Sequence, residues 1–285
     1  MNLLRALVNR HYVGTTEAAA TPSATGPPGS LDGVLRAYRN GSIFATTHGD
    51  AAPAVLGLHG WARRARDFDR VFAGLDAVAL DLPGFGASPP PPDAWGSPEY
   101  AAAVATAIEE IGDGERPAPL VVVGHSFGGR VAVHLAAARP DLVRALVLTG
   151  VPLVPAPGAP SKRAPALVFR AGRALRRAGL LNETRLEALR QRYGSRDYAA
   201  ATGVMREVLV RVVNETYEAP LGAITCPIEL AWGELDDVAP PTVAEAVAAR
   251  CPTATVALCP GAGHLTLTAA PECVRAAVDR CLQLT

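Results

Sequence analysis

The sequence carries no excess of charge of either sign, because its 27 lysine and arginine residues are matched by 27 aspartate and glutamate residues. A chain without net charge lacks the broad positive potential with which proteins attract nucleic acids and other polyanions. It also lacks any run of about 18 apolar residues, the length that a membrane-spanning helix requires. We therefore expect neither a nucleic-acid partner nor stable insertion into a membrane.

Cysteines are few, and their spacing fits no metal site. They are odd in number and lie in the C-terminal third of the chain, at Cys226, Cys251, Cys259, Cys273 and Cys281. None has the neighbouring residues that are typical of a catalytic thiol. We interpret them as reduced core or surface thiols of a cytoplasmic protein, and we expect no bound metal.

The chain does contain enough apolar sequence for a large core. Its 285 residues are 49% hydrophobic, which suits one α/β domain of the usual large size. The first 30 residues stand apart, because Thr15 to Ser30 consists almost entirely of alanine, threonine, serine, glycine and proline. That composition is typical of a flexible linker. We treat residues 1–30 as an N-terminal extension and linker.

Short apolar segments alternate with helical segments along most of the remaining chain. This alternation is typical of a doubly wound, mostly parallel β-sheet, here opened by a hairpin around Asn40-Gly41. The expected strands are Val34–Tyr38, Ser42–Thr47, Ala54–Leu58, Ala77–Leu80, Leu120–Val123, Ala145–Leu148, Ile228–Trp232 and Thr255–Leu258. Between Pro152 and Pro220 the alternation stops. The helices expected there are Leu167–Leu180, Glu183–Tyr193 and Val204–Val213.

One short motif places a serine in the turn between an expected strand and an expected helix. The run Gly124-His125-Ser126-Phe127-Gly128 follows the strand expected at 120–123 and precedes a helix-favouring stretch at 130–139. A sharp strand-to-helix turn strains its central residue and tolerates only small residues at the flanking positions. The hydroxyl is then exposed at a helix N-terminus, where developing negative charge is stabilised. Ser126 is therefore the candidate nucleophile.

A serine nucleophile needs a base, and His264 is the histidine best placed to supply it. It lies in a glycine-rich loop between the strand expected at 255–258 and the last helix. A base on such a loop can reach a serine at the same edge of a parallel sheet. Of the other histidines, His125 adjoins the serine, but its side chain should project away from it.

The base in turn needs an orienting acid, which should follow another strand between the serine and the histidine. The loop after the strand expected at 228–232 supplies Asp236 and Asp237. On position alone, both stay open. The loop after Ala145–Leu148 carries no carboxylate and so offers no alternative.

In several short segments the chain resembles the α/β-hydrolase family. The resemblance is carried by Leu58-His59-Gly60-Trp61, by Asp81-Leu82-Pro83-Gly84-Phe85-Gly86-Ala87-Ser88, by the serine turn, and by the acid and histidine loops, in the family's order. The family's pattern W-G-x-x-D aligns its acid with Asp236. The resemblance also implies an oxyanion hole formed by the backbone N–H groups of Trp61 and Phe127, and a structural role for His59.

The same resemblance implies how the chain is divided. The family places a helical cap over the nucleophile, so we expect a core of residues 31–151 and 221–285 and a cap of residues 152–220. Basic residues cluster in the expected cap, at Lys162, Arg163, Arg170, Arg173, Arg176 and Arg177. Charge runs on helices are usually solvated faces. The alternative is an acidic carrier protein docking on the cap, because the chain also resembles esterases that cleave the methyl ester of a pimeloyl chain on acyl carrier protein.

These residues predict a serine hydrolase that cleaves an ester or related acyl bond of a small molecule and needs no cofactor. Carbon–carbon bond hydrolases, peptidases and cofactor-free haloperoxidases of the family use the same residues, so these activities stay open. A ligand-binding protein that retains the fold is the alternative from another class.

Overall fold

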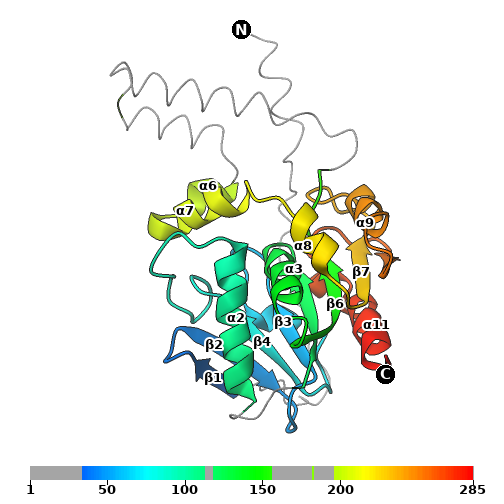
Figure 1. The fold of residues 1–285 in the computed structure, drawn as a ribbon, viewed down its shortest axis with the longest axis horizontal. Coiled ribbons are helices and arrows are strands. Elements are labelled where there is room, and N and C mark those ends of the chain that lie inside the picture. Colours follow the sequence, from blue (N-terminus) through cyan, green and yellow to red (C-terminus); the bar gives the residue numbers. More distant parts are fainter. Residues whose placement is uncertain (1–33, 113–117, 156–181, 183–195, 285) are drawn as a thin grey trace, which may run out of the picture. The chain divides into compact units, whose positions relative to one another are not determined.

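The fold is built on one eight-stranded sheet (Figure 1). The computed structural model describes residues 34–112, 118–155, 182 and 196–284. The strand order is β1-β2-β4-β3-β5-β6-β7-β8; β2 pairs antiparallel with β1 and β4, and the other neighbouring pairs are parallel. The strands are β1 (Val34–Tyr38), β2 (Ile43–His48), β3 (Val55–Leu58), β4 (Ala77–Asp81), β5 (Leu120–His125), β6 (Val143–Thr149), β7 (Ile228–Gly233) and β8 (Ala254–Cys259). The mostly parallel α/β fold expected from the sequence is confirmed.

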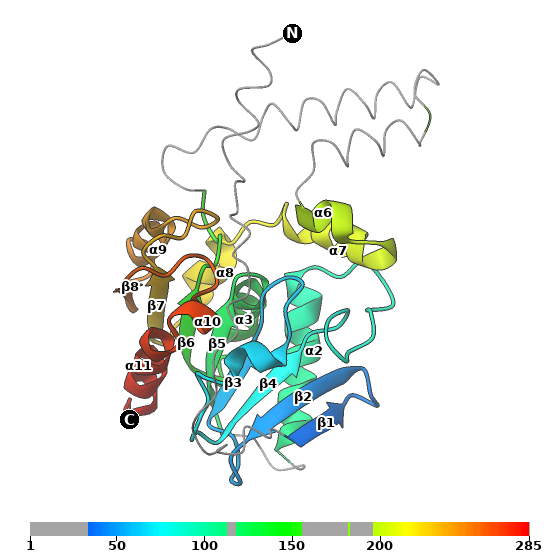
Figure 2. The ribbon, with the colours of Figure 1, turned by 180° about the vertical axis from the view of Figure 1, so that it is seen from behind.

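Helices cover both faces of the sheet (Figures 1 and 2). One face packs against α2 (Ser97–Ile111), α3 (Phe127–Ala138), α8 (Glu218–Ala223) and α9 (Pro241–Ala248). The other face packs against η1 (Ala65–Phe68), α10 (Thr266–Ala269) and α11 (Pro271–Leu282). Successive residues of a strand point to opposite faces, so Val122 of β5 enters one core and Val123 enters the other. Burial on both faces explains why these strands are continuous apolar runs.

The observed strands extend beyond the expected ones where backbone pairing continues into the loops. β5 runs to His125 and pairs with Thr149 of β6, although the apolar run ends at Val123. The backbone N–H of Ser126 then donates to the Thr149 carbonyl at 3.0 Å. The nucleophile turn is therefore anchored to the neighbouring strand.

Most of the expected cap lies outside the described residues, as do residues 1–30 and the basic cluster between Lys162 and Arg177. The described part contains α6 (Arg196–Ala200), α7 (Gly203–Val212) and the first turn of α8. α7 coincides with the helix expected at 204–213. It buries Val208 and Val212 in the same core as α2 and α3, so this helix packs directly on the sheet domain.

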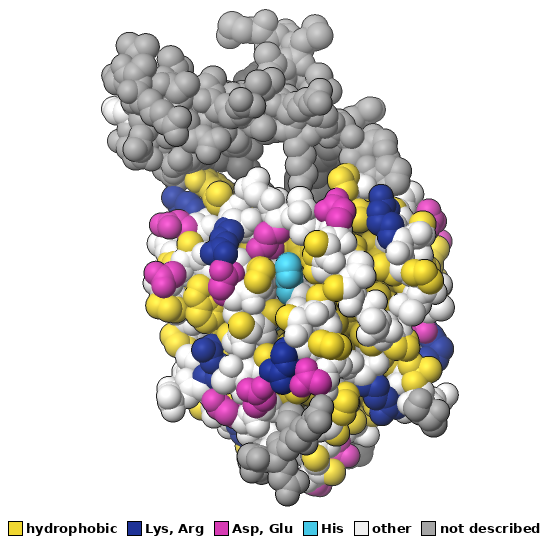
Figure 3. Space-filling model, viewed as in Figure 1, with side chains coloured by type: hydrophobic (Ala, Val, Ile, Leu, Met, Phe, Trp, Pro, Cys, Tyr) yellow, Lys and Arg dark blue, Asp and Glu magenta, His cyan; other side chains and the backbone are white. Residues whose placement is uncertain are grey.

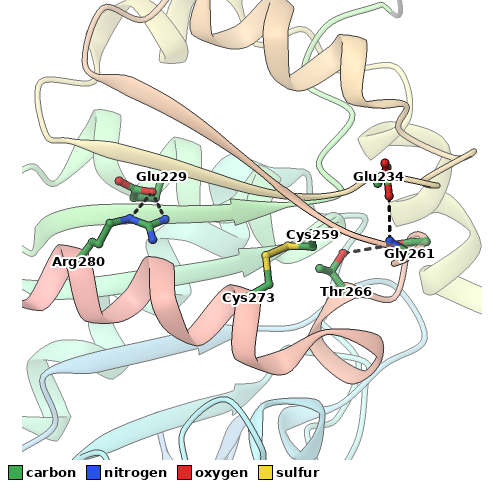
Figure 4. Close-up of a disulfide and its surroundings, with 8 residues drawn as sticks. Glu229, Glu234, Cys259, Gly261, Thr266, Cys273 and Arg280 are labelled. Atoms are coloured by element: carbon green, nitrogen blue, oxygen red, sulfur yellow. Dashed lines mark hydrogen bonds and ion pairs between the residues drawn. A yellow bond between two sulfur atoms is a disulfide. The ribbon is translucent and has the colours of Figure 1, made fainter.

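The expectation that every cysteine is reduced is wrong for two of them. A disulfide joins Cys259, the last residue of β8, to Cys273 in the first turn of α11, with Cα atoms 5.7 Å apart (Figure 4). The chain between them turns back onto the sheet edge, which their spacing does not reveal. Cys226, Cys251 and Cys281 are free thiols, as expected.

Candidate active site

Ser126 occupies a strained turn between β5 and α3. Its φ of +48° and ψ of −109° are unusual for a residue other than glycine. Gly128 permits the turn, because a Cβ atom there would overlap the Leu58 carbonyl, and a Cβ on Gly124 would lie 2.5 Å from the Cα of Gly129. The turn thus has the strain and the small flanking residues expected from the motif.

The His264 imidazole lies between Ser126 and Asp236. Its Nε2 is 3.2 Å from Oγ of Ser126, and its Nδ1 is 2.9 and 3.1 Å from the two carboxylate oxygens of Asp236. The Asp236 side chain is fully buried, whereas that of His264 is 18% exposed. Asp237 is exposed. Of the two acids left open by the sequence, Asp236 is the one that contacts the imidazole.

The surrounding backbone fixes the Asp236 carboxylate. Its Oδ1 accepts hydrogen bonds from the backbone N–H groups of Val238 at 2.9 Å and Ala239 at 2.8 Å. The acid loop is also joined to the histidine loop, because the N–H of Leu235 donates to the Ala262 carbonyl at 2.8 Å. These hydrogen bonds hold the Asp236 carboxylate in position beside the imidazole.

Gly150, which follows β6, leaves the space in which the imidazole and the carboxylate meet. A Cβ atom there would lie 3.0 Å from Nδ1 of His264 and 3.1 Å from Oδ2 of Asp236, and the residue has a φ of +61°. The sequence showed that this loop lacks a carboxylate. The structure adds that a side chain at this position would crowd both groups and would require a strained backbone.

His125 is a functional contact that sequence reasoning missed. Its side chain does turn away from the serine hydroxyl, as expected, but its Nε2–H donates to the backbone carbonyl of His264 at 2.9 Å. Burial and, to a lesser extent, the nearby His264 lower the pKa of His125 to about 3. The ring is therefore neutral and acts as a fixed donor to the loop that carries His264.

His59 connects the loop after β3 to the loop after β4. Its Nδ1–H donates to the Gly60 carbonyl at 2.7 Å, and its Nε2 accepts from the N–H of Leu82 at 3.0 Å. Burial lowers the pKa of this histidine, which leaves it neutral and able to do both. This is the structural role that the family resemblance implied.

Asp81 and Ser88 hold the loop after β4 in place. The Asp81 carboxylate accepts from the backbone N–H groups of Ala65 at 2.7 Å and Ala87 at 2.8 Å. The Ser88 hydroxyl donates to the Asp81 carbonyl at 2.5 Å and accepts from the N–H of Phe44 at 2.8 Å. All the polar groups of this run are therefore used to fix the loop that carries Phe85.

Three aromatic rings lie together beside the serine turn. Phe85 contacts Trp61 with ring centroids 4.9 Å apart, and Trp61 contacts Phe127 at 5.5 Å. Phe127 is the first residue of α3, where backbone N–H groups have no acceptor within the helix. The structure thus brings Trp61 and Phe127 side by side. Their backbone role in an oxyanion hole stays a prediction.

The described residues contain no cluster of three or more histidine, cysteine, aspartate or glutamate side chains able to hold a metal. No helix in the described part of the chain is long and apolar enough to cross a membrane. Basic and acidic side chains are interspersed on the face seen in Figure 3. No patch of one sign dominates that face, in keeping with the zero net charge.

The sequence profile described as "Alpha/beta hydrolase family" matches residues 55–276, which include Ser126, Asp236 and His264. The chain belongs to the α/β hydrolase family. This α/β hydrolase is 42% identical over 110 residues to lipase LipV of Mycobacterium tuberculosis, a match that covers 37% of this chain and 40% of that protein. It is 39% identical over 104 residues to the pimeloyl-[acyl-carrier protein] methyl ester esterase of Neisseria meningitidis, covering 35% of this chain and 37% of that protein.

These matches therefore span about two-fifths of each relative. Structural similarity extends further: an esterase from Thermogutta terrifontis superposes with a TM-score of 0.61 and 22% sequence identity, covering 88% of this chain and 98% of that one. At that identity the similarity establishes the fold of this α/β hydrolase alone. The two sequence relatives named above are a lipase and an esterase by name.

Proposed function

We propose that this α/β hydrolase cleaves a carboxylic ester, or a related acyl bond, of a small molecule. The observation that carries the proposal is the His264 imidazole between the Ser126 hydroxyl and the buried Asp236 carboxylate. A hydroxyl, an imidazole and a carboxylate in this order form an activated nucleophile. The names of the sequence relatives support an ester substrate.

Acylation begins when Ser126 Oγ attacks the acyl carbonyl carbon and His264 Nε2 takes the hydroxyl proton. Asp236 accepts the Nδ1–H hydrogen bond, which keeps Nε2 free to act as the base. The backbone N–H groups of Trp61 and Phe127 stabilise the charge on the carbonyl oxygen, each by about 3–4 kcal/mol. The alcohol then leaves with the proton from His264, and the acyl group stays on Ser126.

Deacylation repeats these steps with water as the nucleophile. Water gives a proton to His264 Nε2 as its oxygen attacks the acyl carbon, and the proton returns to Ser126 Oγ as the acid is released. Every proton is carried by His264, so the sequence of steps needs neither a metal nor a cofactor. The apolar rings of Phe85, Trp61 and Phe127 favour an uncharged acyl group next to the serine.

The first test is labelling with a fluorophosphonate, with the adduct located by mass spectrometry, alongside nitrophenyl esters from acetate to laurate. We expect labelling at Ser126 and ester turnover. Labelling without ester turnover would favour cleavage of another bond, such as a carbon–carbon bond. Absence of both would overturn the proposal in favour of a ligand-binding protein.

Substitutions assign the roles. Ser126→Ala and His264→Ala should each reduce turnover to near background, and Asp236→Asn should reduce it by about 100-fold or more. Asp237→Asn is the matched control, because that carboxylate is exposed. If Asp237→Asn proves the more damaging change, the assignment of the acid is wrong.

A narrower substrate is suggested by the pimeloyl-carrier esterase among the relatives. The basic residues at 162–177, on which the sequence offers docking of an acidic carrier as the alternative to a solvated face, lie outside the described residues. Incubation with a pimeloyl-carrier methyl ester decides this point. If that ester stays intact while nitrophenyl esters are hydrolysed, the narrower proposal fails and the broader one stands.

A further inference from the structure

Arg130 contacts the chain at two points that are 60 residues apart. It lies in the first turn of α3, close to Ser126. Its Nη1 donates to the backbone carbonyl of Val212 at 2.6 Å, and its Nη2 lies 3.3 Å from the carbonyl of Pro152. Pro152 follows β6, and Val212 is the last residue of α7. One guanidinium therefore holds the chain where it leaves β6 and where α7 ends.

A buried aromatic ring and a series of hydrogen bonds lie around this guanidinium. Its carbon lies 5.5 Å from the ring centroid of Tyr217, a residue that is 1% exposed. The Tyr217 hydroxyl donates to Oε2 of Glu215 at 2.5 Å, and Oε1 of Glu215 accepts from the N–H of Ser97 at 2.7 Å. The connection after α7 is thus fastened to α3 by Arg130 and to the N-terminus of α2 by Glu215. Arginine carries its donors on separate nitrogens of one planar cation, whereas lysine has a single ammonium nitrogen.

The same helix α7 touches the candidate active site near its other end. The Met205 sulfur and methyl group fill the space beside Gly84, where a Cβ atom would overlap them. Gly84 precedes Phe85, whose ring packs on Trp61 and, with centroids 6.0 Å apart, on Phe127. The position of α7 therefore determines how closely Met205 approaches the aromatic rings beside the serine.

The C-terminal end of α7 has a specific need for this donor. The last carbonyls of a helix lack partners within the helix, and a cation there also interacts favourably with the helix dipole. Without Arg130, the Pro152 carbonyl loses this donor and the Val212 carbonyl keeps only the N–H of Glu215, at 3.3 Å. α7 would then be held by its apolar contacts, by the Glu215 connection and by Arg211, which donates to the Ala94 carbonyl at 2.8 Å and pairs with Glu99.

We propose that Arg130 is a positioning residue that fixes α7 against the Gly84–Phe85 loop and thereby sets which acyl chains the site accepts. The part of this inference that concerns selectivity rests on the proposed ester hydrolysis. The part that concerns the anchoring of α7 does not. The two parts are therefore measured separately, by amide hydrogen exchange and by ester kinetics.

The experiment compares Arg130→Met and Arg130→Lys with a matched control, Arg144→Met. Arg144 also donates to backbone carbonyls at a helix end, those of Cys281 and Leu282 in the last turn of α11 and of Leu284 just beyond it, and it does not contact α7. In exchange measured by mass spectrometry, Arg130→Met should accelerate exchange in peptides covering α7 by about tenfold, equivalent to about 1.4 kcal/mol. Arg144→Met should accelerate exchange at the end of α11 and leave α7 unchanged.

In kinetics, Arg130→Met should change the ratio of kcat/KM for nitrophenyl laurate to that for nitrophenyl acetate by about tenfold. The change should arise in KM, with kcat for the acetate within about twofold of wild type, because Ser126 and His264 are untouched. Arg130→Lys keeps the charge without the planar fork, so it should be intermediate. Arg144→Met should leave the ratio as it is in the wild type.

Each part can be overturned. If amide exchange in α7 is unchanged in Arg130→Met, Arg130 does not anchor this helix. If exchange is faster but the laurate-to-acetate ratio of kcat/KM is unchanged, the anchor does not set selectivity. A wild-type protein that hydrolyses no ester would refute the proposed function and with it the selectivity, while exchange would still decide the anchoring. If Arg130→Met fails to fold, Arg130→Lys carries both measurements.

Discussion

The backbone carbonyl of His264 accepts a hydrogen bond from Nε2 of His125, the residue before Ser126, at 2.9 Å. The turn that presents the candidate nucleophile therefore also holds the loop that carries the candidate base. The distance of 3.2 Å between Ser126 Oγ and His264 Nε2 depends on the relative position of these two loops. The His125 side chain is thus a second link between them, in addition to the contact between Ser126 and His264.

His125→Phe should lower kcat by about tenfold, because it keeps a ring of similar size and removes the donor to the His264 carbonyl. Leaving a buried carbonyl unsatisfied costs about 1–3 kcal/mol, which is enough to shift the histidine loop. The measurement is kcat for a nitrophenyl ester together with the free energy of unfolding. His134→Phe is the control, because the buried Nε2 of His134 has no hydrogen-bond partner to lose. Equal kcat values for the two variants would contradict the role given to His125.

Stability should decrease as the pH falls below about 6.5, the ordinary pKa of histidine. Burial lowers the pKa of His59 in the folded protein and lowers that of His125 to about 3. Below about pH 6.5 the unfolded chain binds protons at these positions more readily than the folded protein does, and for His125 this difference extends down to about pH 3. The free energy of unfolding therefore falls with decreasing pH, by up to about 1.4 kcal/mol per pH unit for each group. Above pH 6.5 neither group contributes a pH dependence.

Urea unfolding at pH 7.5, 6.0 and 5.0 tests this expectation. Carboxylates also titrate towards the lower end of this range, so the wild type is compared with His125→Phe, which removes one of the two histidines. The variant should show a shallower loss of stability between pH 6.5 and 5.0. Parallel curves for the two proteins would mean that His125 is not excluded from protonation by the fold.

The sheet was predictable because each strand carries its own signal. β5 and β6 are continuous apolar runs flanked by helical stretches, and burial on both faces of a parallel sheet produces such runs. Ser126 and His264 were predictable for a related reason, since each follows a strand and lies in a glycine-containing loop whose chemistry is local. The choice of Asp236 over Asp237 needed the family pattern. The two neighbouring aspartates have the same chemistry and differ only in the orientation of their side chains, which the sequence does not reveal.

The hydrogen bonds that were not predicted join residues that are far apart in the chain and have no local sequence signal. His125 and His264 are 139 residues apart, and Arg130 and Val212 are 82 residues apart. Each uses a side chain on one element and a backbone carbonyl on the other, and a carbonyl has no residue identity to recognise. The disulfide between Cys259 and Cys273 was not predicted for a different reason. The spacing of the two cysteines is compatible with free thiols as well as with a disulfide.

Gly150→Ala should reduce turnover by about tenfold or more while leaving most of the stability intact. The added methyl group would lie about 3 Å from the His264 ring and from Oδ2 of Asp236, and the backbone φ of +61° disfavours any side chain, at about 1–2 kcal/mol. The His264 imidazole and the Asp236 carboxylate would have to separate to admit it. Kinetics and urea unfolding are compared with those of Gly222→Ala in α8, where a Cβ meets nothing within 4 Å. Similar kcat values for both variants would mean that the site tolerates a side chain at position 150.

Reduction of the Cys259–Cys273 disulfide should destabilise the protein and should lower kcat without abolishing turnover. The cysteines enclose the loop that carries His264, and a closed loop of about 15 residues contributes about 3 kcal/mol by restricting the unfolded chain. The turn itself keeps other supports, including the bond from the Gly261 N–H to Glu234 at 3.0 Å and that from the Thr266 hydroxyl to the Gly263 carbonyl at 3.2 Å (Figure 4).

Unfolding and kcat are measured with and without dithiothreitol, which supplies the two electrons and two protons for the two thiols. The double variant Cys259→Ser/Cys273→Ser should match the reduced wild type and be insensitive to the reductant. Cys226→Ser removes a free thiol and should respond as the wild type does. A reductant effect on kcat that persists in the double variant would place the sensitive group elsewhere. Full stability of the double variant would show that the disulfide does not support the fold around His264.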